Sequence, residues 1–273
     1  MAIINFSKMV ASGNDFVVVE RASLPPALNL ARLAKSVCDR KFGIGADGLL
    51  VLEKIKDADA RMRIFNADGS EANMCGNGAR CVAYYLAHAQ GRNNCDSLTI
   101  KTRAGLLKAS VRNGQVKLRL TDPTVIRFAI PVEIAGRLIK VNFINTGVPH
   151  AVVFVEGLAS LAVAPLGEEI RYHKTFAPQG TNANFVEVLA RDTIRVRTYE
   201  RGVEDETLAC GTGTVASALV WAAQSNMRTP GLVKVITQGK ETLKVYFSRN
   251  KNTFTNVWLE GKARIVFQGE LQV

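Results

Sequence analysis

The hydrophobic pattern along the chain is dominated by short runs of β-branched and aromatic residues, which predict strands. These runs cover residues 16–20, 49–52, 61–65, 98–101, 116–120, 138–144, 151–155, 185–189, 193–199, 233–236, 243–247 and 257–260. Apolar positions with helical spacing occur only at 28–38, 78–88 and 213–224, with a weaker stretch at 158–170. One long helix per half among many strands, without strict β-α-β alternation, predicts an α+β fold with mostly antiparallel pairing.

Segments of the first half recur in the second half. Gly13 and Gly147 open similar segments 134 positions apart (147 − 13), and Phe65-Asn66 matches Tyr199-Glu200 at the same spacing. Gly45 and Leu50 match Gly180 and Phe185 at a spacing of 135 (180 − 45). We infer an internal duplication that forms two similar, pseudo-symmetric α/β lobes, each around a central helix, with the active site in the cleft between them.

The break between the lobes is expected at the turn signal Asp122-Pro123-Thr124, near the middle of the chain. The N-terminal lobe is then residues 1–121, completed by about 262–273, and the C-terminal lobe is 122–261.

Composition narrows the class of protein. The formal charge is +11, but the basic residues are spread along the chain and only 7% of residues are aromatic, which favours a solvated basic surface over a nucleic-acid site. No run approaches the ~18 apolar residues of a membrane helix, and the N-terminus lacks the pattern of a secretory signal. We therefore expect a cytoplasmic protein that binds a small molecule and neither nucleic acid nor membrane.

The five cysteines do not suggest a disulfide scaffold, and Cys38, Cys81 and Cys95 are interpreted as structural. The sequence has no C-x-x-C or H-x-x-x-H pair, so no metal site is expected. A G-x-G-x-x-G match at residues 43–48 follows a predicted helix and precedes a predicted strand. A dinucleotide fingerprint needs the reverse order, so we interpret these glycines as a structural turn.

The two remaining cysteines lie in a repeated motif. Met74-Cys75-Gly76-Asn77-Gly78 recurs as Ala209-Cys210-Gly211-Thr212-Gly213, and each copy opens a predicted helix. A helix N-terminus lowers the pKa of a thiol and binds anions, so each copy can hold a reactive sulfur beside a substrate carboxylate. Two such thiols on opposite sides of one carbon atom would form a two-base proton-transfer device.

Polar loops precede both thiols. Residues 65–75 carry Asn, Asp and Glu side chains directly into Cys75, and residues 199–207 supply Arg201 together with several carboxylates before Cys210. These groups have the donors and acceptors needed to orient a zwitterionic amino acid.

The same motifs resemble the diaminopimelate epimerase family. The resemblance rests on Lys8-Met9-x-x-x-Gly13-Asn14-Asp15-Phe16, residues 65–71, Cys75-Gly76-Asn77-Gly78-Ala79-Arg80-Cys81, and Tyr199-Glu200-Arg201-Gly202 leading into residues 209–213. It covers most of the chain. Proline racemases typically carry His at the position of Asn77, and phenazine-biosynthesis-type isomerases lack the cysteine pair.

The resemblance implies a cofactor-independent isomerase that interconverts L,L- and meso-diaminopimelate in lysine and peptidoglycan-precursor synthesis. Cys75 and Cys210 would exchange the roles of base and acid, tuned by His150 and Glu200. Backbone N–H groups of Gly76, Asn77, Gly211 and Thr212 would hold the reacting carboxylate. Asn14, Asn66, Asn182, Glu200 and Arg201 would hold the ammonium groups and the distal carboxylate.

Two positions depart from the family pattern. Val148 stands where Asn is common, with Asn145 as a candidate replacement, and Gly48 stands where many members have Gln. A racemase of another amino acid is therefore the alternative enzyme, and a non-catalytic amino-acid-binding protein is the alternative of another class. We expect a homodimer.

Overall fold

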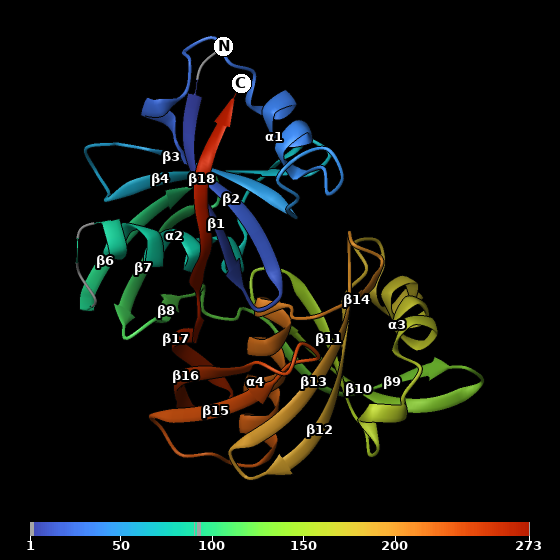
Figure 1. Cartoon of the computed structure of the whole chain (residues 1–273). Coiled ribbons are helices and arrows are strands. Elements are labelled where there is room, and N and C mark those ends of the chain that lie inside the picture. Colours follow the sequence, from blue (N-terminus) through green and yellow to red (C-terminus); the bar gives the residue numbers. More distant parts are fainter. Residues whose placement is uncertain (1–2, 90, 92–93, 273) are drawn as a thin grey trace. The chain divides into compact units, whose positions relative to one another are not determined.

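The computed structural model describes residues 3–89, 91 and 94–272, and its chain forms two units. The first unit comprises residues 1–118 together with 260–273, and the second comprises residues 119–259. The division thus falls within a few residues of the turn at Asp122-Pro123-Thr124. The C-terminal segment belongs to the unit that the N-terminus begins, and Figure 1 shows the red C-terminal strand beside the blue first strand.

Strand pairing in the first unit follows the order β18–β1–β2–β3–β4–β6–β7–β8. The β2–β3 and β4–β6 pairs are parallel and the others are antiparallel. The elements are β1 (Ile3–Ala11), β2 (Asn14–Glu20), η1 (Arg21–Ser23), α1 (Leu30–Cys38), β3 (Gly48–Glu53), β4 (Ala60–Asn66), β5 (Glu71–Ala72), α2 (Gly76–Ala89), β6 (Asn94–Thr102), β7 (Gly105–Arg112), β8 (Gln115–Arg119) and β18 (Arg264–Gln272).

The second unit repeats this pairing in the order β9–β10–β11–β12–β13–β15–β16. Its parallel pairs are β11–β12 and β13–β15. The elements are β9 (Ile126–Ile134), β10 (Arg137–Asn145), β11 (Pro149–Phe154), η2 (Leu158–Ser160), α3 (Val163–Tyr172), η3 (Lys174–Phe176), β12 (Asn182–Ala190), β13 (Thr193–Glu200), β14 (Asp205–Thr207), α4 (Gly211–Gln224), β15 (Gly231–Ile236), β16 (Thr242–Asn250) and β17 (Thr253–Lys262), which runs on into the first unit.

The register of the strands confirms the duplication. Leu49 pairs with Phe65 in the first unit, and Ala183 pairs with Tyr199, each 134 positions later, in the second. The hairpins β4–β5 and β13–β14 carry the chain into α2 and α4 in the same way. The proposed match of Leu50 with Phe185 is wrong by one residue. Phe185 pairs with Val153, and the equivalent pair in the first unit is Val51 with Val19.

The helices α2 and α4 occupy equivalent places in the two units. Almost every side chain of α4 from Gly213 to Ala223 is buried, and Figure 1 shows the helix among the strands of its own unit. A helix that is apolar on all sides is stable only inside a core. The fold is therefore sheet-dominated α+β with a central helix in each unit, as the sequence predicts.

Candidate active site

Cys75 lies immediately before α2 in the first unit. Its carbonyl oxygen accepts a hydrogen bond from the Ala79 N–H at 2.9 Å, and its half-buried sulfur accepts one from the Gly78 N–H at 3.5 Å. The first N–H groups of a helix have no partner within it and carry positive partial charge. The start of α2 therefore favours a negative sulfur and a carboxylate beside it.

Cys210 is the N-cap residue of α4 in the second unit. Its carbonyl oxygen accepts from the Thr214 N–H at 2.8 Å, and its sulfur lies 3.5 Å from Oγ1 of Thr212. A Cβ atom on Gly213 would collide with Oδ1 of Asn184, so the close approach of α4 to β12 requires glycine there. The sequence predicts a lowered pKa for this thiol, but burial, and then the charge of Glu200, instead raise the pKa of Cys210 to about 12.

Glu200, at the end of β13, is the partner of Cys210. Its carboxylate is hydrogen-bonded to the Cys210 thiol and accepts a bond from Oγ1 of Thr207 at 3.1 Å. Burial raises the pKa of Glu200. A carboxylate with a raised pKa, bonded to a thiol, is suited to accept the proton of that thiol.

His150 lies on β11 of the second unit and is fully buried. Its Nδ1 accepts from the side-chain amide of Asn184 at 3.2 Å, which places the ring proton on Nε2. Nε2 has no hydrogen-bond partner among the residues that the structure describes. Burial, and then the charge of Arg201, lower the pKa of His150 to about 3, so the ring is neutral at physiological pH.

Asn184 is a site residue that the sequence analysis missed. Its amide nitrogen donates to the Ala151 carbonyl at 2.9 Å as well as to His150, and its oxygen accepts from Oγ1 of Thr198 at 3.0 Å. Its side chain thus fixes the His150 tautomer and contacts the start of α4.

Asn182 and Arg201 lie together in the second unit. The Asn182 amide donates to the Pro149 carbonyl at 2.9 Å, and its oxygen accepts from the Arg201 backbone N–H at 2.8 Å. The Arg201 guanidinium donates to the Gln179 carbonyl at 3.1 Å. Asn182 therefore positions the backbone at Arg201, and one of its amide protons remains for another partner.

In the first unit, Asn66 ends β4 at the surface. Its side-chain amide donates to Oγ of Ser70 at 3.0 Å, and its backbone N–H donates to the Ser70 carbonyl at 2.8 Å. This turn projects the exposed Asn66 side chain ahead of the Cys75 loop.

The two departures from the family pattern have structural consequences. The Asn145 oxygen accepts from the Gly147 backbone N–H at 3.0 Å, so this side chain holds the turn that contains Val148. Gly48 is buried where β3 begins, and a Cβ there would stand 2.8 Å from the Phe65 carbonyl oxygen.

A matched pair of ion pairs precedes the two thiols, and the sequence analysis missed it. Arg63 binds Glu71 through two hydrogen bonds of 2.8 and 3.0 Å, and Arg197 binds Glu206 through two of 2.6 and 2.7 Å. The arginines are 134 positions apart (197 − 63) and the glutamates 135 (206 − 71). Each bidentate pair braces the hairpin that leads into its cysteine.

The G-x-G-x-x-G match has the order of elements that the sequence predicts. It follows α1 and ends at the first residue of β3. The Gly45 N–H donates to the Val37 carbonyl at 3.0 Å, which closes the end of α1. The motif is therefore a helix-terminating turn.

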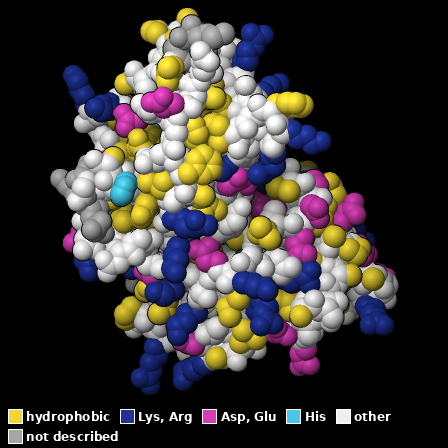
Figure 2. All heavy atoms as spheres, in the orientation of Figure 1, with side chains coloured by type: hydrophobic (Ala, Val, Ile, Leu, Met, Phe, Trp, Pro, Cys, Tyr) yellow, Lys and Arg dark blue, Asp and Glu magenta, His cyan; other side chains and the backbone are white. Residues whose placement is uncertain are grey.

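Within the described residues, no group of three or more His, Cys, Asp or Glu side chains is placed to hold a metal ion. None of the helices described is long and apolar enough to cross a membrane. Figure 2 shows the basic side chains scattered over the visible face among acidic ones.

Comparison with solved structures defines the class of fold. A phenazine biosynthesis protein of the PhzF family from Bacillus anthracis shares the fold, with a TM-score of 0.77, 19% identity and full coverage of both chains. A probable proline racemase from Agrobacterium radiobacter shares the fold as well, with a TM-score of 0.72, 18% identity and coverage of 99% of this chain and 92% of its own.

Sequence similarity then identifies the family. The diaminopimelate epimerase profile matches residues 6–126 and 142–266. The diaminopimelate epimerase of Methanocella arvoryzae is 41% identical over 100% of this chain and 98% of its own, and that of Chlorobaculum tepidum is 40% identical over 96% and 99%. The chain belongs to the diaminopimelate epimerase family and is an isomerase.

Proposed function

We propose that the protein interconverts L,L- and meso-diaminopimelate by a two-base proton transfer between Cys75 and Cys210. Membership of the family and relatives of about 40% identity along the whole chain support the reaction. The observation that carries the mechanism is that a cysteine stands immediately before the helix in each unit, with its carbonyl oxygen accepting a hydrogen bond from the helix backbone.

The α-proton of an amino acid is too weakly acidic for a free thiolate, so the developing carbanion needs stabilisation. In our proposal the N–H groups of Gly76 and Asn77, and those of Gly211 and Thr212, hold the reacting carboxylate at the positive ends of α2 and α4. One thiolate removes the proton and the opposite thiol delivers another, which inverts the carbon atom. This electrostatic stabilisation takes the place of a cofactor.

The neighbouring groups receive distinct roles in the proposal. Glu200 accepts the Cys210 proton when Cys210 becomes the base, because the two groups are hydrogen-bonded. His150, neutral and with Nε2 available, tunes the thiol chemistry. Asn14, Asn66, Asn182 and Arg201 orient the rest of the substrate.

Deuterium labelling tests the two-base mechanism. In deuterium oxide we expect the first turnover to place solvent deuterium mainly in the product epimer, because the incoming proton comes from the thiol that did not remove the first one. Mass spectrometry of both epimers after partial conversion measures it. Equal label in recovered substrate and product would establish a single base.

We further propose that the protein acts as a homodimer in the cytoplasm. The described cysteines are all free thiols, and a working thiol pair requires a reducing compartment. Support for the dimer comes from apolar side chains exposed on β1 and β18, where Ile3, Val266 and Phe267 are 66%, 45% and 48% exposed. Hydrophobic side chains gather over this region in Figure 2.

Light scattering checks the assembly. We expect the mass of two chains for the wild type and that of one for Phe267→Asp, because a charge within an apolar interface opposes association. A mass of one chain for the wild type would contradict the proposal. Leu138→Asp, at an exposed apolar residue of the other unit, serves as the control and is expected to leave the mass unchanged.

A further inference from the structure

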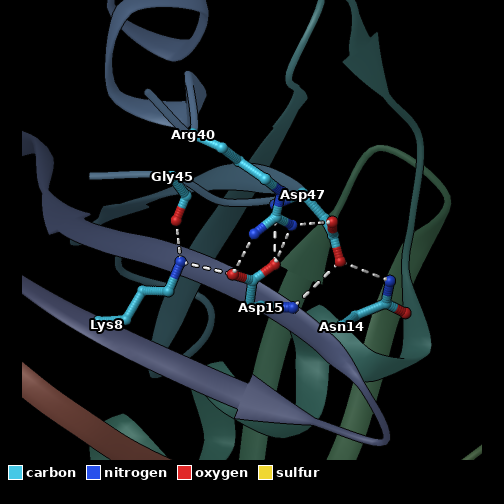
Figure 3. A network of polar contacts seen from close by, with 6 residues as sticks. All are labelled: Lys8, Asn14, Asp15, Arg40, Gly45 and Asp47. Atoms are coloured by element: carbon cyan, nitrogen blue, oxygen red, sulfur yellow. Dashed lines mark hydrogen bonds and ion pairs between the residues drawn. The ribbon is translucent and has the colours of Figure 1, made fainter. Parts of the chain in front are cut away.

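Four side chains of the first unit form a hydrogen-bonded series that starts inside α2. Arg80 is completely buried, and its guanidinium donates to Oδ1 of Asn77 and to Oγ of Ser12, the latter at 2.6 Å. The Asn77 amide donates to Oδ1 of Asn14. The Asn14 amide in turn donates to Oδ2 of Asp47 at 3.0 Å, and Figure 3 shows this last contact.

The two ends of this series fix its direction. An arginine side chain can only donate hydrogen bonds, and an ionised carboxylate can only accept them. Neither asparagine amide can turn over without placing two donors or two acceptors against each other. Each amide group has two protons, and the series engages one of them, so each asparagine keeps a second N–H that the series does not use.

Asp47, the acceptor end of the series, is held in place by Arg40, which also binds the neighbouring Asp15. Arg40 donates to Oδ1 of Asp47 at 2.7 Å and to Oδ1 of Asp15 at 2.9 Å, while Lys8 donates to Oδ2 of Asp15 at 2.6 Å and to the Gly45 carbonyl. Figure 3 shows Asp15 between the two cations. Burial would raise the pKa of Asp15, but the bonds from Arg40 and Lys8 hold it at about 2.

Backbone N–H groups also hold Asp47 and Asp15 together. The Asp47 N–H donates to Oδ1 of Asp15 at 3.1 Å, and the Asp15 N–H donates to Oδ2 of Asp47 at 3.2 Å. Asp47 can therefore hardly move relative to β2, which carries Asn14.

We propose that Asp47 and Arg80 are positioning residues that lock Asn14 and Asn77 as hydrogen-bond donors, so that the subsite beside the start of α2 accepts a carboxylate oxygen and discriminates against an ammonium or a carboxamide. The proposal rests on the proposed function for the identity of the substrate. It assigns a carboxylate group of the substrate, and not an ammonium group, to Asn14.

Inhibition by a substrate analogue tests the discrimination. The probes are diaminopimelate and its two monoamides, in which one carboxylate is a carboxamide. In Asp47→Asn the series loses its obligate acceptor, and Asn14 can turn its oxygen toward a ligand. In this variant we expect at least one monoamide to bind better relative to diaminopimelate. The ratio of its inhibition constant to the KM for diaminopimelate should then be at least tenfold lower than in the wild type. Parallel weakening of all three ligands would overturn the proposal.

Asp96→Asn is the matched control. Asp96 is an exposed carboxylate of the same unit that pairs with Arg112 at 2.7 Å. The same ratio is expected to stay at its wild-type value in this variant. A tenfold change here would mean that any lost carboxylate in the unit alters the ratio, which would also overturn the proposal.

A spectroscopic measurement separates the proposal from the proposed function, since it needs no substrate. In protein labelled with ¹⁵N-asparagine, Asp47→Asn should move the side-chain amide signals of both Asn14 and Asn77, with Asn66, which bonds Ser70, as an internal reference. An Asn77 signal that stays in place would overturn the proposal even in an active enzyme. Deuterium found equally in substrate and product would instead defeat only the two-base mechanism.

A second variant interrupts the hydrogen-bonded series and serves as the test if Asp47→Asn does not fold. Asn14→Asp has the same shape and only acceptors, so it should reverse the preference toward a monoamide and also shift the Asn77 signal. An unchanged preference in a folded Asn14→Asp protein would overturn the assignment of Asn14 as a donor.

Discussion

Cys75→Ala and Cys210→Ala are each expected to lower kcat/KM for diaminopimelate by about 10²- to 10⁴-fold, the contribution of a general acid or base. Both variants should remain folded, because each removes only one small thiol at a helix start. Coupled assays of both epimers and thermal melting followed by circular dichroism measure the two effects.

Cys38→Ala is the matched control for the thiol variants. Cys38 is buried in the apolar cluster around α1, and burial raises the pKa of its thiol to about 11. A protonated thiol in a core is a small apolar group, so its loss should reduce stability and leave kcat/KM within about twofold. More than a tenth of the wild-type rate in either Cys75→Ala or Cys210→Ala would contradict the mechanism.

Glu200→Gln is expected to lower kcat/KM by about 10²-fold, since glutamine cannot take the Cys210 proton. A variant enzyme leaves the equilibrium constant of the reaction unchanged, so the factor should be equal in both directions. Burial still raises the pKa of Cys210 in this variant, but the charge of Glu200 no longer adds to it. The pKa of the thiol therefore falls, and the alkaline limb of the pH profile should move to lower pH.

The profiles of kcat/KM against pH for Glu200→Gln and for the wild type test whether the alkaline limb moves to lower pH. Glu156→Gln, at an exposed carboxylate of the same unit, is expected to match the wild type. An alkaline limb that stays in place or moves to higher pH would show that Glu200 does not act on Cys210.

The fold is predictable from sequence wherever burial produces a regular apolar pattern. The α4 helix and the strands β3, β11 and β13 have such patterns and lie where the sequence predicts them. The strand β1 was missed because Ser7 and Lys8 are buried within it, where partners from other segments satisfy them. β18 was missed because most of its side chains are exposed, which leaves its sequence without a strand pattern.

The site divides in a similar way. The positions of Cys75 and Cys210 at helix starts could be predicted, because a duplicated motif repeats a local structure and local structure depends on neighbouring residues. Asn184 and Asp47 act through partners 34 and 33 positions away, which spacing alone does not reveal. The Arg63–Glu71 and Arg197–Glu206 pairs could have been found, since both of their members recur at the spacing of the duplication.

The pairing of the last strand, β18, with the first strand, β1, affects the order in which the two units can fold during synthesis. All segments of the second unit are available once residue 259 has left the ribosome, whereas the first unit must wait for residues 260–273. Domains usually fold in the order of their synthesis, but here the unit begun first is completed last. Throughout translation the β1 edge that pairs with β18 stays open, along Ile3 to Val10, to other chains. A pause at any point of synthesis after β1 therefore lengthens the time for which this edge can pair with another chain.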